Sequence, residues 1–298
     1  MVSIDKSLPN GLGIGPMRTG SSWLHEYLAS RGDVCLPKGV KETFYFAEKN
    51  GMGEVWYENH FHHYDPVRHL RIIEICPTLF DNYAAIGRVS RTLHEPTLMV
   101  TLRNPVDRTW SHYMHWRQHG RTTQDFDTAV RESPEIVTHG LYARHLNRWL
   151  DEFGRGAVRI TLYDDLKERP VEYARQVDEV FGLPASSARG VPGRKINSAA
   201  LPVNPLIAKM TSRTVTKLRN SGLHWIVNAG KRIGLADVIY GSSRKAATRP
   251  VMNPGTHDYL VEQFSDDVDR LEKLLHIDLG VWRRQWAAFR DKPVRKQA

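Results

Sequence analysis

The residues best placed to do chemistry lie near the N-terminus, in the stretch GPMRTGSS at 15–22. Its two glycines and two serines nearly reproduce G-x-x-x-x-G-K-[ST], the loop that cradles nucleotide phosphates. Ser21 stands where that loop has its lysine, and the only cation inside the stretch is Arg18. The stretch therefore predicts a site for a phosphate-like group other than the usual ATP or GTP site. The plain alternative is a glycine-rich turn that only joins a strand to a helix.

Short apolar segments, most of them ended by a glycine or proline, alternate with segments of helical period. Strands are expected at 12–14, 69–78, 97–105 and 156–166. Helices are expected at 21–30, 104–119, 141–153, 170–181, 255–276 and 278–289. Strands that alternate with helices indicate a parallel sheet covered by helices on both faces. The expected fold is therefore α/β, a P-loop-like three-layer arrangement, in a single domain over 1–298.

One segment, at about 185–245, is rich in Pro, Gly, Ser and basic residues. It is expected to form an irregular basic insertion over the active site. Within it, 206–235 is basic and amphipathic, which keeps open a peripheral contact with a membrane surface. A non-catalytic protein that binds anions or membranes through this stretch is one alternative function.

The charge of the chain favours an anionic ligand. Lys and Arg number 42 against 33 Asp and Glu, which gives a net charge of +9. No nucleic-acid-binding motif such as a C2H2 finger occurs, so a small polyanion is expected rather than nucleic acid. The two cysteines have no C-x-x-C spacing, and neither a secretory signal nor an apolar run of roughly 20 residues is found. These features predict a cytoplasmic protein.

A kinase or NTPase needs the loop lysine and an acid after a buried strand to organise magnesium. Here Arg103 follows the buried strand LMVTL instead. An arginine at this place favours a phosphate over a metal. The sequence thus predicts a nucleotide with an extra phosphate and no metal requirement, and a nucleotide kinase with a degenerate loop is the second alternative.

Histidines raise the question of a metal site. His112, His115 and His119 share one helical face, and the stretch HFHH lies at 60–63. Their spacing permits metal binding, but no carboxylate or cysteine completes either set at standard spacing. No metal site is therefore predicted. His112 is expected to contact the acceptor, and it is a secondary candidate for the general base.

Together, the loop and the strand-end arginine resemble the PAPS-dependent sulfotransferases, which use 3′-phosphoadenosine 5′-phosphosulfate (PAPS). GPMRTGSSWL resembles their 5′-phosphosulfate loop, and LRNPVDRTWSHY at 102–113 resembles their 3′-phosphate motif. KETFYF is similar to the heparan-sulfate, or glycan, branch. The resemblance runs over about 12–183 and resumes near 245–275. It implies transfer of a sulfuryl group to a hydroxyl, or an amine, of a small-molecule or glycan acceptor.

The resemblance also implies roles for the residues that match its motifs. The 5′-phosphosulfate would be held by Arg18, Thr19, Gly20, Ser21 and Ser22. The rest of the nucleotide would meet Arg103 and Ser111 at the 3′-phosphate, Tyr163 near the adenine, and a closing basic loop with Arg244, Lys245 and Arg249. Arg18 replaces the family's usual lysine. Because arginine stays protonated, its expected catalytic role is to stabilise charge on the leaving group.

Glu42, in GVKETFYF, is the expected general base, since transfer to a hydroxyl requires removal of the attacking proton. The glycan branch has a glutamate before an aromatic run at this place. Lys41 and Lys38 are expected to tune the pKa of this carboxyl or to hold an acidic acceptor. Without the resemblance, a solvated Glu–Lys surface would be the ordinary interpretation of these residues.

Overall fold

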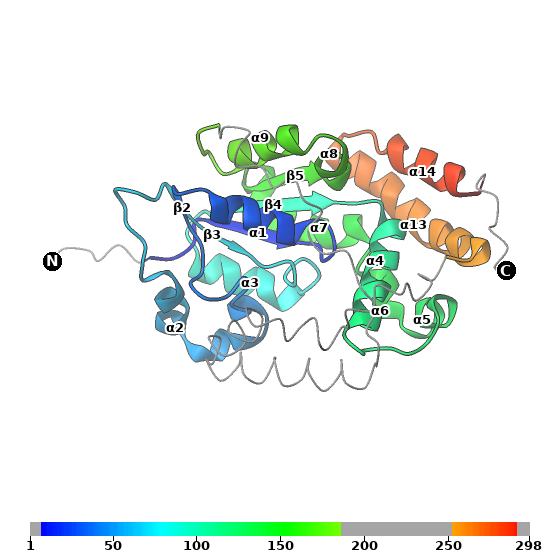
Figure 1. Cartoon of the computed structure of the whole chain (residues 1–298), viewed down its shortest axis with the longest axis horizontal. Coiled ribbons are helices and arrows are strands. Elements are labelled where there is room, and N and C mark those ends of the chain that lie inside the picture. The colour runs from blue at the N-terminus through cyan, green and yellow to red at the C-terminus, as the bar shows by residue number, and fades with distance from the viewer. Residues whose placement is uncertain (1–6, 186–251, 291–298) are drawn as a thin grey trace, which may run out of the picture. The chain divides into compact units, whose positions relative to one another are not determined.

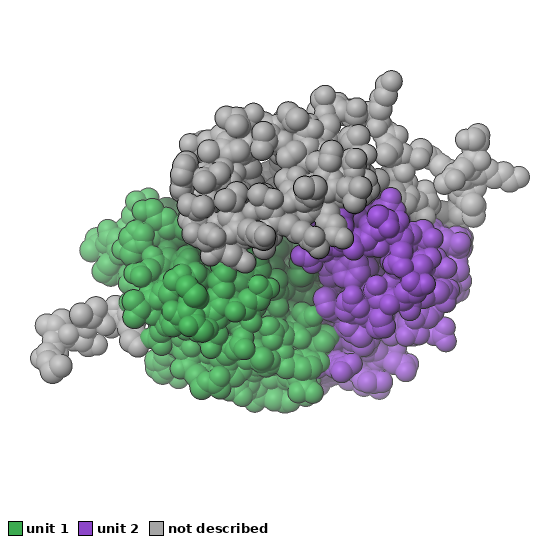
Figure 2. All heavy atoms as spheres, turned by 90° about the horizontal axis from the view of Figure 1, so that it is seen from below, with its two compact units in different colours: residues 1–103, 145–198, 222–226 green, residues 104–144, 199–221, 227–298 purple. Residues whose placement is uncertain are grey.

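The computed structural model describes residues 7–185 and 252–290. Within them the chain forms two compact units (Figure 2), unit 1 with 7–103 and 145–185 and unit 2 with 104–144 and 252–290. Arg244, Lys245, Arg249 and nearly all of the expected insertion at 185–245 lie outside the described residues. Their roles, and the single domain over 1–298, stay predictions.

Unit 1 is built on a five-stranded parallel sheet with the order β2-β3-β1-β4-β5 (Figure 1). Its strands are β1 (Gly11–Gly15), β2 (Val34–Cys35), β3 (Arg71–Ile75), β4 (Thr97–Leu102) and β5 (Val158–Leu162). In the central strand, Leu12 pairs with Glu74 of β3 and with Leu98 of β4. Because parallel strands end at the same edge, the residues that follow β1, β3, β4 and β5 are brought together there.

Three helices pack on one face of this sheet (Figure 1): α1 (Ser21–Ser30), α8 (Tyr163–Glu168) and α9 (Pro170–Val180). The central strand presents only glycines to them. A Cβ at Gly11 would lie 2.9 Å from the ring of Phe181, which follows α9, and one at Gly13 would lie 3.3 Å from the side chain of Leu24 in α1. These two glycines therefore allow the close approach of the helical layer to β1.

The other face is covered by α3 (Tyr83–Thr92) and α7 (Tyr142–Ala157), of which 145–157 belong to unit 1 (Figure 1). Trp149 of α7 is fully buried and donates its indole N–H to the carbonyl of Phe80 at 2.9 Å. Gly154 has φ 74°, a left-handed conformation that ends the regular helix. Helices on both faces of a parallel sheet confirm the α/β three-layer fold expected from the sequence.

The chain between β2 and β3 contains short turns of helix. These are η1 (Tyr45–Lys49), η2 (Asn50–Met52), α2 (Glu54–Glu58) and η3 (Asn59–Phe61). Tyr45, Phe46, Tyr57 and Phe61 are buried and form a small aromatic cluster, with the rings of Tyr45 and Tyr57 stacked at 4.3 Å. This cluster anchors the segment that carries Lys41 and Glu42.

Unit 2 is helical in its described residues. It contains α4 (Pro105–Gln118), α5 (Phe126–Glu132), α6 (Pro134–Thr138), α13 (Pro254–Leu275) and α14 (Gly280–Arg290). Asn104 caps α4 by accepting a hydrogen bond from the backbone N–H of Val106 at 3.1 Å. The same side chain bonds to Gln285 and Trp286, which ties the start of α4 to α14.

The elements expected from the sequence form at nearly the expected residues, with one clear difference. The strand expected over 156–166 ends at Leu162, and Tyr163 begins α8. Asp164 and Asp165 occupy the first turn of that helix, where negative charge is favourable. The strand prediction was therefore wrong over the residues that follow Leu162.

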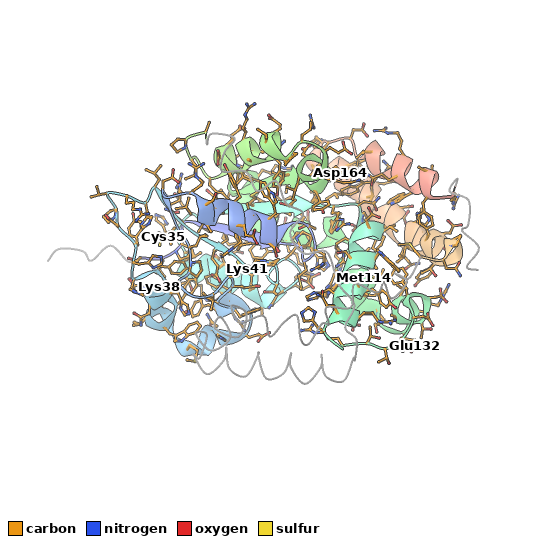
Figure 3. All side chains as sticks on the ribbon, viewed as in Figure 1. Cys35, Lys38, Lys41, Met114, Glu132 and Asp164 are labelled. Carbon is orange, nitrogen blue, oxygen red and sulfur yellow. The ribbon has the colours of Figure 1, made fainter. Side chains whose placement is uncertain are left out.

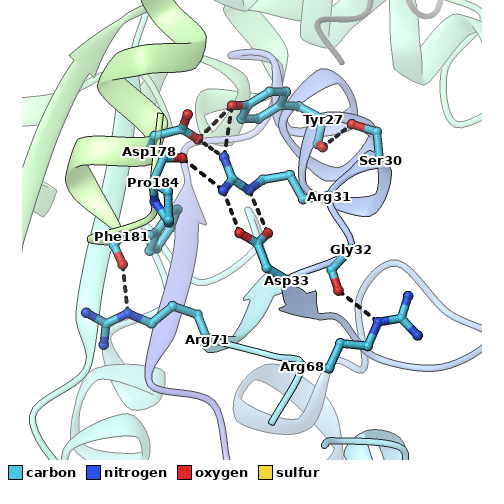
Figure 4. A network of polar contacts seen from close by, with 10 residues as sticks. All are labelled: Tyr27, Ser30, Arg31, Gly32, Asp33, Arg68, Arg71, Asp178, Phe181 and Pro184. Atoms are coloured by element: carbon cyan, nitrogen blue, oxygen red, sulfur yellow. Dashed lines mark hydrogen bonds and ion pairs between the residues drawn. The ribbon is translucent and has the colours of Figure 1, made fainter. Parts of the chain in front are cut away.

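A buried polar network joins the end of α1 to α9 (Figure 4). Arg31 donates to Asp33 at 2.9 and 2.7 Å and to Asp178 at 2.7 Å, and the hydroxyl of Tyr27 donates to Asp178 at 2.6 Å. The Arg31 and Asp178 side chains are only 7% and 3% exposed. The network fixes the helix whose N-terminus follows the glycine-rich loop.

Asp178→Asn is expected to lower the free energy of unfolding by about 1.5–3 kcal/mol, because a buried arginine then loses a charged hydrogen-bond partner. Urea denaturation measures the loss. Glu172→Gln is the matched control, since Glu172 pairs with Arg175 on the exposed surface. Glu172→Gln is expected to lower the free energy of unfolding by less than about 1 kcal/mol. Equal decreases in the two variants would contradict the stabilising role of the network.

Candidate active site

The loop between β1 and α1 has an unusual backbone. Gly15, Arg18 and Gly20 have φ values of 111°, 74° and 100°, all in the left-handed region. A Cβ at Gly15 would lie 2.6 Å from the carbonyl oxygen of Pro77, and one at Gly20 would lie 2.6 Å from Leu166. Glycine is therefore required at both ends of the loop, whereas Arg18 adopts this conformation with a side chain.

The loop leads directly into the N-terminus of α1. Gly20 is the N-cap, and no side chain caps this end of the helix. The N–H groups of the first turn and the positive end of the helix dipole therefore suit an anion. The hydroxyl of Thr19 donates to the carbonyl of Pro16 at 2.7 Å, so it braces the loop. A contact of Thr19 with a ligand would come from its backbone N–H.

Lys41 brings a second cation to the start of α1. Its Nζ donates to the hydroxyls of Ser21 at 3.1 Å and Ser22 at 3.3 Å. Burial lowers the pKa of Lys41 to about 8; the charge of Glu42 opposes this shift, and that of Arg18 adds to it. Figure 3 shows Lys41 next to α1. The sequence predicts a role for Lys41 toward Glu42 or the acceptor, and the structure also brings it to both loop serines.

Glu42 is held by a residue that follows β3. The hydroxyl of Thr78 donates to Oε1 of Glu42, and the backbone N–H of Thr78 donates to the same oxygen at 3.4 Å. Burial raises the pKa of Glu42 to about 7; the Thr78 bond opposes this shift, and the charge of Glu74 adds to it. A carboxylate with a pKa near neutrality is suited to general base catalysis.

A fully buried carboxylate, Glu74 on β3, fixes the chain next to Glu42. Its Oε1 accepts from the backbone N–H of Thr43 at 2.6 Å, and its Oε2 accepts from the hydroxyl of Tyr57 at 2.7 Å. Burial raises the pKa of Glu74, and these two bonds lower it. Glu74 therefore positions Glu42 through the adjacent peptide group and also raises the pKa of its carboxyl.

Arg103, at the end of β4, lies beside the loop. Its Nη1 donates to the carbonyl oxygen of Arg18 at 3.1 Å, and its guanidinium lies 4.5 Å from the ring centroid of Tyr163. Burial lowers the pKa of Arg18, and the nearby charge of Arg103 lowers it further. The two positive guanidinium groups repel each other, and a bound anion would relieve that repulsion.

Two other predicted site residues belong to unit 2. Ser111 and His112 are on α4 in unit 2. His112 is buried, and its Nδ1 lies 3.1 Å from a nitrogen of Arg108, which also donates to the carbonyl of Ile136 at 2.5 Å. Arg108 thus links α4 to the chain at Ile136. The ligand contacts of Ser111 and His112 stay predictions.

Lys38 is exposed, and its Nζ lies 3.4 Å from Nε2 of His62. Within 7–185 and 252–290, no His, Cys, Asp and Glu side chains gather in a group able to hold a metal ion. Both cysteines, Cys35 and Cys76, are buried free thiols. None of the helices in the described part of the chain is long and apolar enough to cross a membrane.

Sequence reasoning missed Thr78 and Glu74 as partners of Glu42. The sequence holds an indication of the position of each residue. Thr78 follows the proline that ends a strand next to β1, so it had to lie at the edge where the loop lies. Glu74 is an acid inside the otherwise apolar run IIEIC, and a buried carboxylate requires hydrogen-bond partners.

Solved structures share this fold. A crystal structure of a sulfotransferase from Alicyclobacillus acidocaldarius is 22% identical with a TM-score of 0.66, over 93% of this chain and 99% of that one. The crystal structure of mouse sulfotransferase SULT7A1 complexed with PAP is 13% identical with a TM-score of 0.51, over 94% of this chain and 88% of that one. At these identities the likeness concerns the fold.

Sequence relatives agree with the glycan branch. The bifunctional heparan sulfate N-deacetylase/N-sulfotransferase 1 of Caenorhabditis briggsae is 27% identical over 202 residues, which are 60% of this chain and 23% of that protein. The membrane-associated sulfotransferase kil1 of Dictyostelium discoideum is 28% identical over 137 residues, 44% of this chain and 29% of that protein. The matches thus span less than a third of either relative.

The predicted cytoplasmic location is wrong. It rested on the absence of a signal and of an apolar span, and it is contradicted by the relatives, which include heparan sulfate enzymes and a membrane-associated sulfotransferase.

The family resemblance rests on more than the two motifs. The model of the sulfotransferase domain matches residues 12–197, which include the loop, Glu42, Arg103 and Tyr163. The match covers more than half of the chain and confirms the recognition made from the motifs. The chain therefore belongs to the sulfotransferase domain family.

Proposed function

We propose that the protein transfers the sulfuryl group of PAPS to a hydroxyl or an amine of a carbohydrate or glycoconjugate acceptor. The observation that carries the proposal is the meeting of Arg18, Arg103 and Lys41 around an uncapped helix N-terminus, with Glu42 adjacent to Lys41 in the chain. The cations suit a donor with several anionic oxygens, and the carboxylate suits removal of a proton. The relatives named for heparan sulfate N-sulfation support a carbohydrate acceptor.

In the proposed reaction the acceptor oxygen or nitrogen attacks sulfur in line with the bridging oxygen of the donor. Glu42 takes the acceptor proton as the new bond forms. The old sulfur–oxygen bond breaks, and its electron pair stays on the 5′-phosphate of the released adenosine 3′,5′-bisphosphate. Arg18 and the loop N–H groups stabilise that developing charge.

The other residue roles follow the same arrangement. Gly20, Ser21 and Ser22 would hold the 5′-phosphosulfate, and Arg103 with Ser111 would hold the 3′-phosphate. Tyr163 would contact the adenine, although its ring also faces the guanidinium of Arg103. The kinase and the non-catalytic alternatives gain no support from the relatives.

Arg103→Ala tests the donor. Wild type is expected to bind adenosine 3′,5′-bisphosphate without magnesium, and the variant is expected to bind it about 10–150-fold more weakly, the effect of losing hydrogen bonds to a charged group. Calorimetry measures both affinities, and ATP with magnesium is titrated beside them. Arg159→Ala, which removes an exposed arginine of β5, is the control and should bind as wild type does. Binding of ATP alone would overturn the proposal in favour of a kinase.

A further inference from the structure

The loop of this chain has serine where phosphate-binding loops have lysine, yet a lysine reaches the same place from another segment. Ser21 holds the lysine position, and the hydroxyls of Ser21 and Ser22 both accept from Lys41 at 3.1 and 3.3 Å. Lys41 is half-buried and lies after β2, about twenty residues further along the chain. The ammonium group thus stands at the N-terminus of α1, where an anion would bind.

We propose that Lys41 binds the sulfonated, 5′ end of the donor and serves as the loop's missing lysine. This inference rests on the proposed function and assigns Lys41 to the donor rather than to the acceptor. An ammonium group carries further N–H donors beyond those that the serines accept, and these can reach a ligand oxygen. When the sulfur–oxygen bond breaks, the electron pair stays on the leaving phosphate, and Lys41 stabilises that charge without giving up its proton.

The surroundings of Lys41 explain why an anion should occupy this place. The charged and titratable groups that face it are Glu42 beside it, Arg18 in the loop, Glu26 and His25 on α1, and Cys76 after β3. Burial lowers the pKa of Lys41 to about 8, and the charge of Arg18 adds to that effect. A bound anion supplies negative charge and therefore favours the protonated ammonium.

This gives a pH signature. Free Lys41 loses its proton as the pH rises through about 8, whereas the anion binds the protonated form, so affinity should fall above that pH. The pKa values of three neighbours lie outside the range above pH 8 in which this decline is expected. The pKa of His25 is lowered to about 4, that of Glu42 is raised only to about 7, and that of the Cys76 thiol is raised well above its ordinary value.

The test is calorimetric titration of adenosine 3′,5′-bisphosphate into wild type and Lys41→Met between about pH 7 and pH 9.5. Lys41→Met is expected to bind about 10–100-fold more weakly at pH 7 and to lose the decline above pH 8. Lys41→Arg should restore binding and keep it constant with pH, because arginine stays charged. Lys167→Met, which removes an exposed lysine of α8, is the matched control and should behave as wild type.

The outcomes separate this inference from the proposed function. If wild type does not bind the bisphosphate at any pH, the proposed function fails and the inference fails with it. If wild type binds and Lys41→Met binds equally well, only the role of Lys41 is overturned. Circular dichroism checks that Lys41→Met is folded. If it is not, a wild-type affinity that stays constant through pH 8–9.5 overturns the role, and a decline supports it.

Discussion

Glu42→Gln is expected to lower turnover by about 10²–10⁴-fold, the usual contribution of a general base. Glutamine keeps the size of the side chain and can still accept the hydrogen bond that Thr78 donates, but it cannot take a proton. Binding of adenosine 3′,5′-bisphosphate should remain, because this residue acts on the acceptor. Release of the bisphosphate from PAPS in the presence of a heparan-type oligosaccharide measures the rate, and calorimetry measures the binding.

The pH profile of the wild type gives the same residue a second signature. The carboxyl must be ionised to act as a base, and its pKa is raised to about 7. With the donor saturating, turnover should therefore rise with pH through about 7 and then level off. Glu42→Gln should not show this rise. Glu48→Gln, at an exposed glutamate of η1, is the control and should keep both rate and profile. If Glu42→Gln turned over as fast as wild type, Glu42 would not be the general base.

Arg18→Gly is expected to lower turnover by about 10²–10³-fold, the typical effect of losing one group that stabilises charge in the transition state. Glycine is the informative replacement because Arg18 has φ 74°. Glycine adopts that conformation readily, so the loop keeps its shape while the cation is lost. Single-turnover kinetics with saturating donor measure the chemical step apart from binding.

The companion variant is Arg18→Lys, which places in this loop the residue that the family usually has there. It should retain most of the rate, since the positive charge is preserved. A thermal melting temperature in Arg18→Gly at or above the wild-type value would show that the fold is intact. A rate in Arg18→Gly close to that of wild type would mean that the leaving group is stabilised by other groups.

Local sequence signals predicted the fold well. Asn104 and Pro105 marked the start of α4, and the glycines of the loop marked its left-handed turns. These features are local, because a cap or a positive φ is set by a few consecutive residues. The end of β5 was missed, since this strand and the helix that begins at Tyr163 have no proline or glycine between them.

The partners within the site were harder to predict because they are contacts between distant segments. The bond from Thr78 to Glu42 and the bond from Lys41 to Ser21 each join different segments after different strands. Periodicity indicates which residues are buried but not which of them meet. The motif alone indicates Glu42 as a candidate base, whereas its environment, and therefore its raised pKa, required the tertiary structure.

The bond from Arg103 to the carbonyl of Arg18 has a consequence for how the nucleotide would be recognised. Arg103 is the proposed contact of the 3′-phosphate, and the carbonyl belongs to the loop proposed for the 5′ end, so one hydrogen bond joins the two subsites. If a phosphate bound at one subsite stabilises the loop, it raises the affinity of the other subsite, and by thermodynamic reciprocity the effect is equal in both directions. The two phosphates of a single nucleotide would then bind cooperatively, and a fragment with one of them would bind more weakly than its share of the contacts implies.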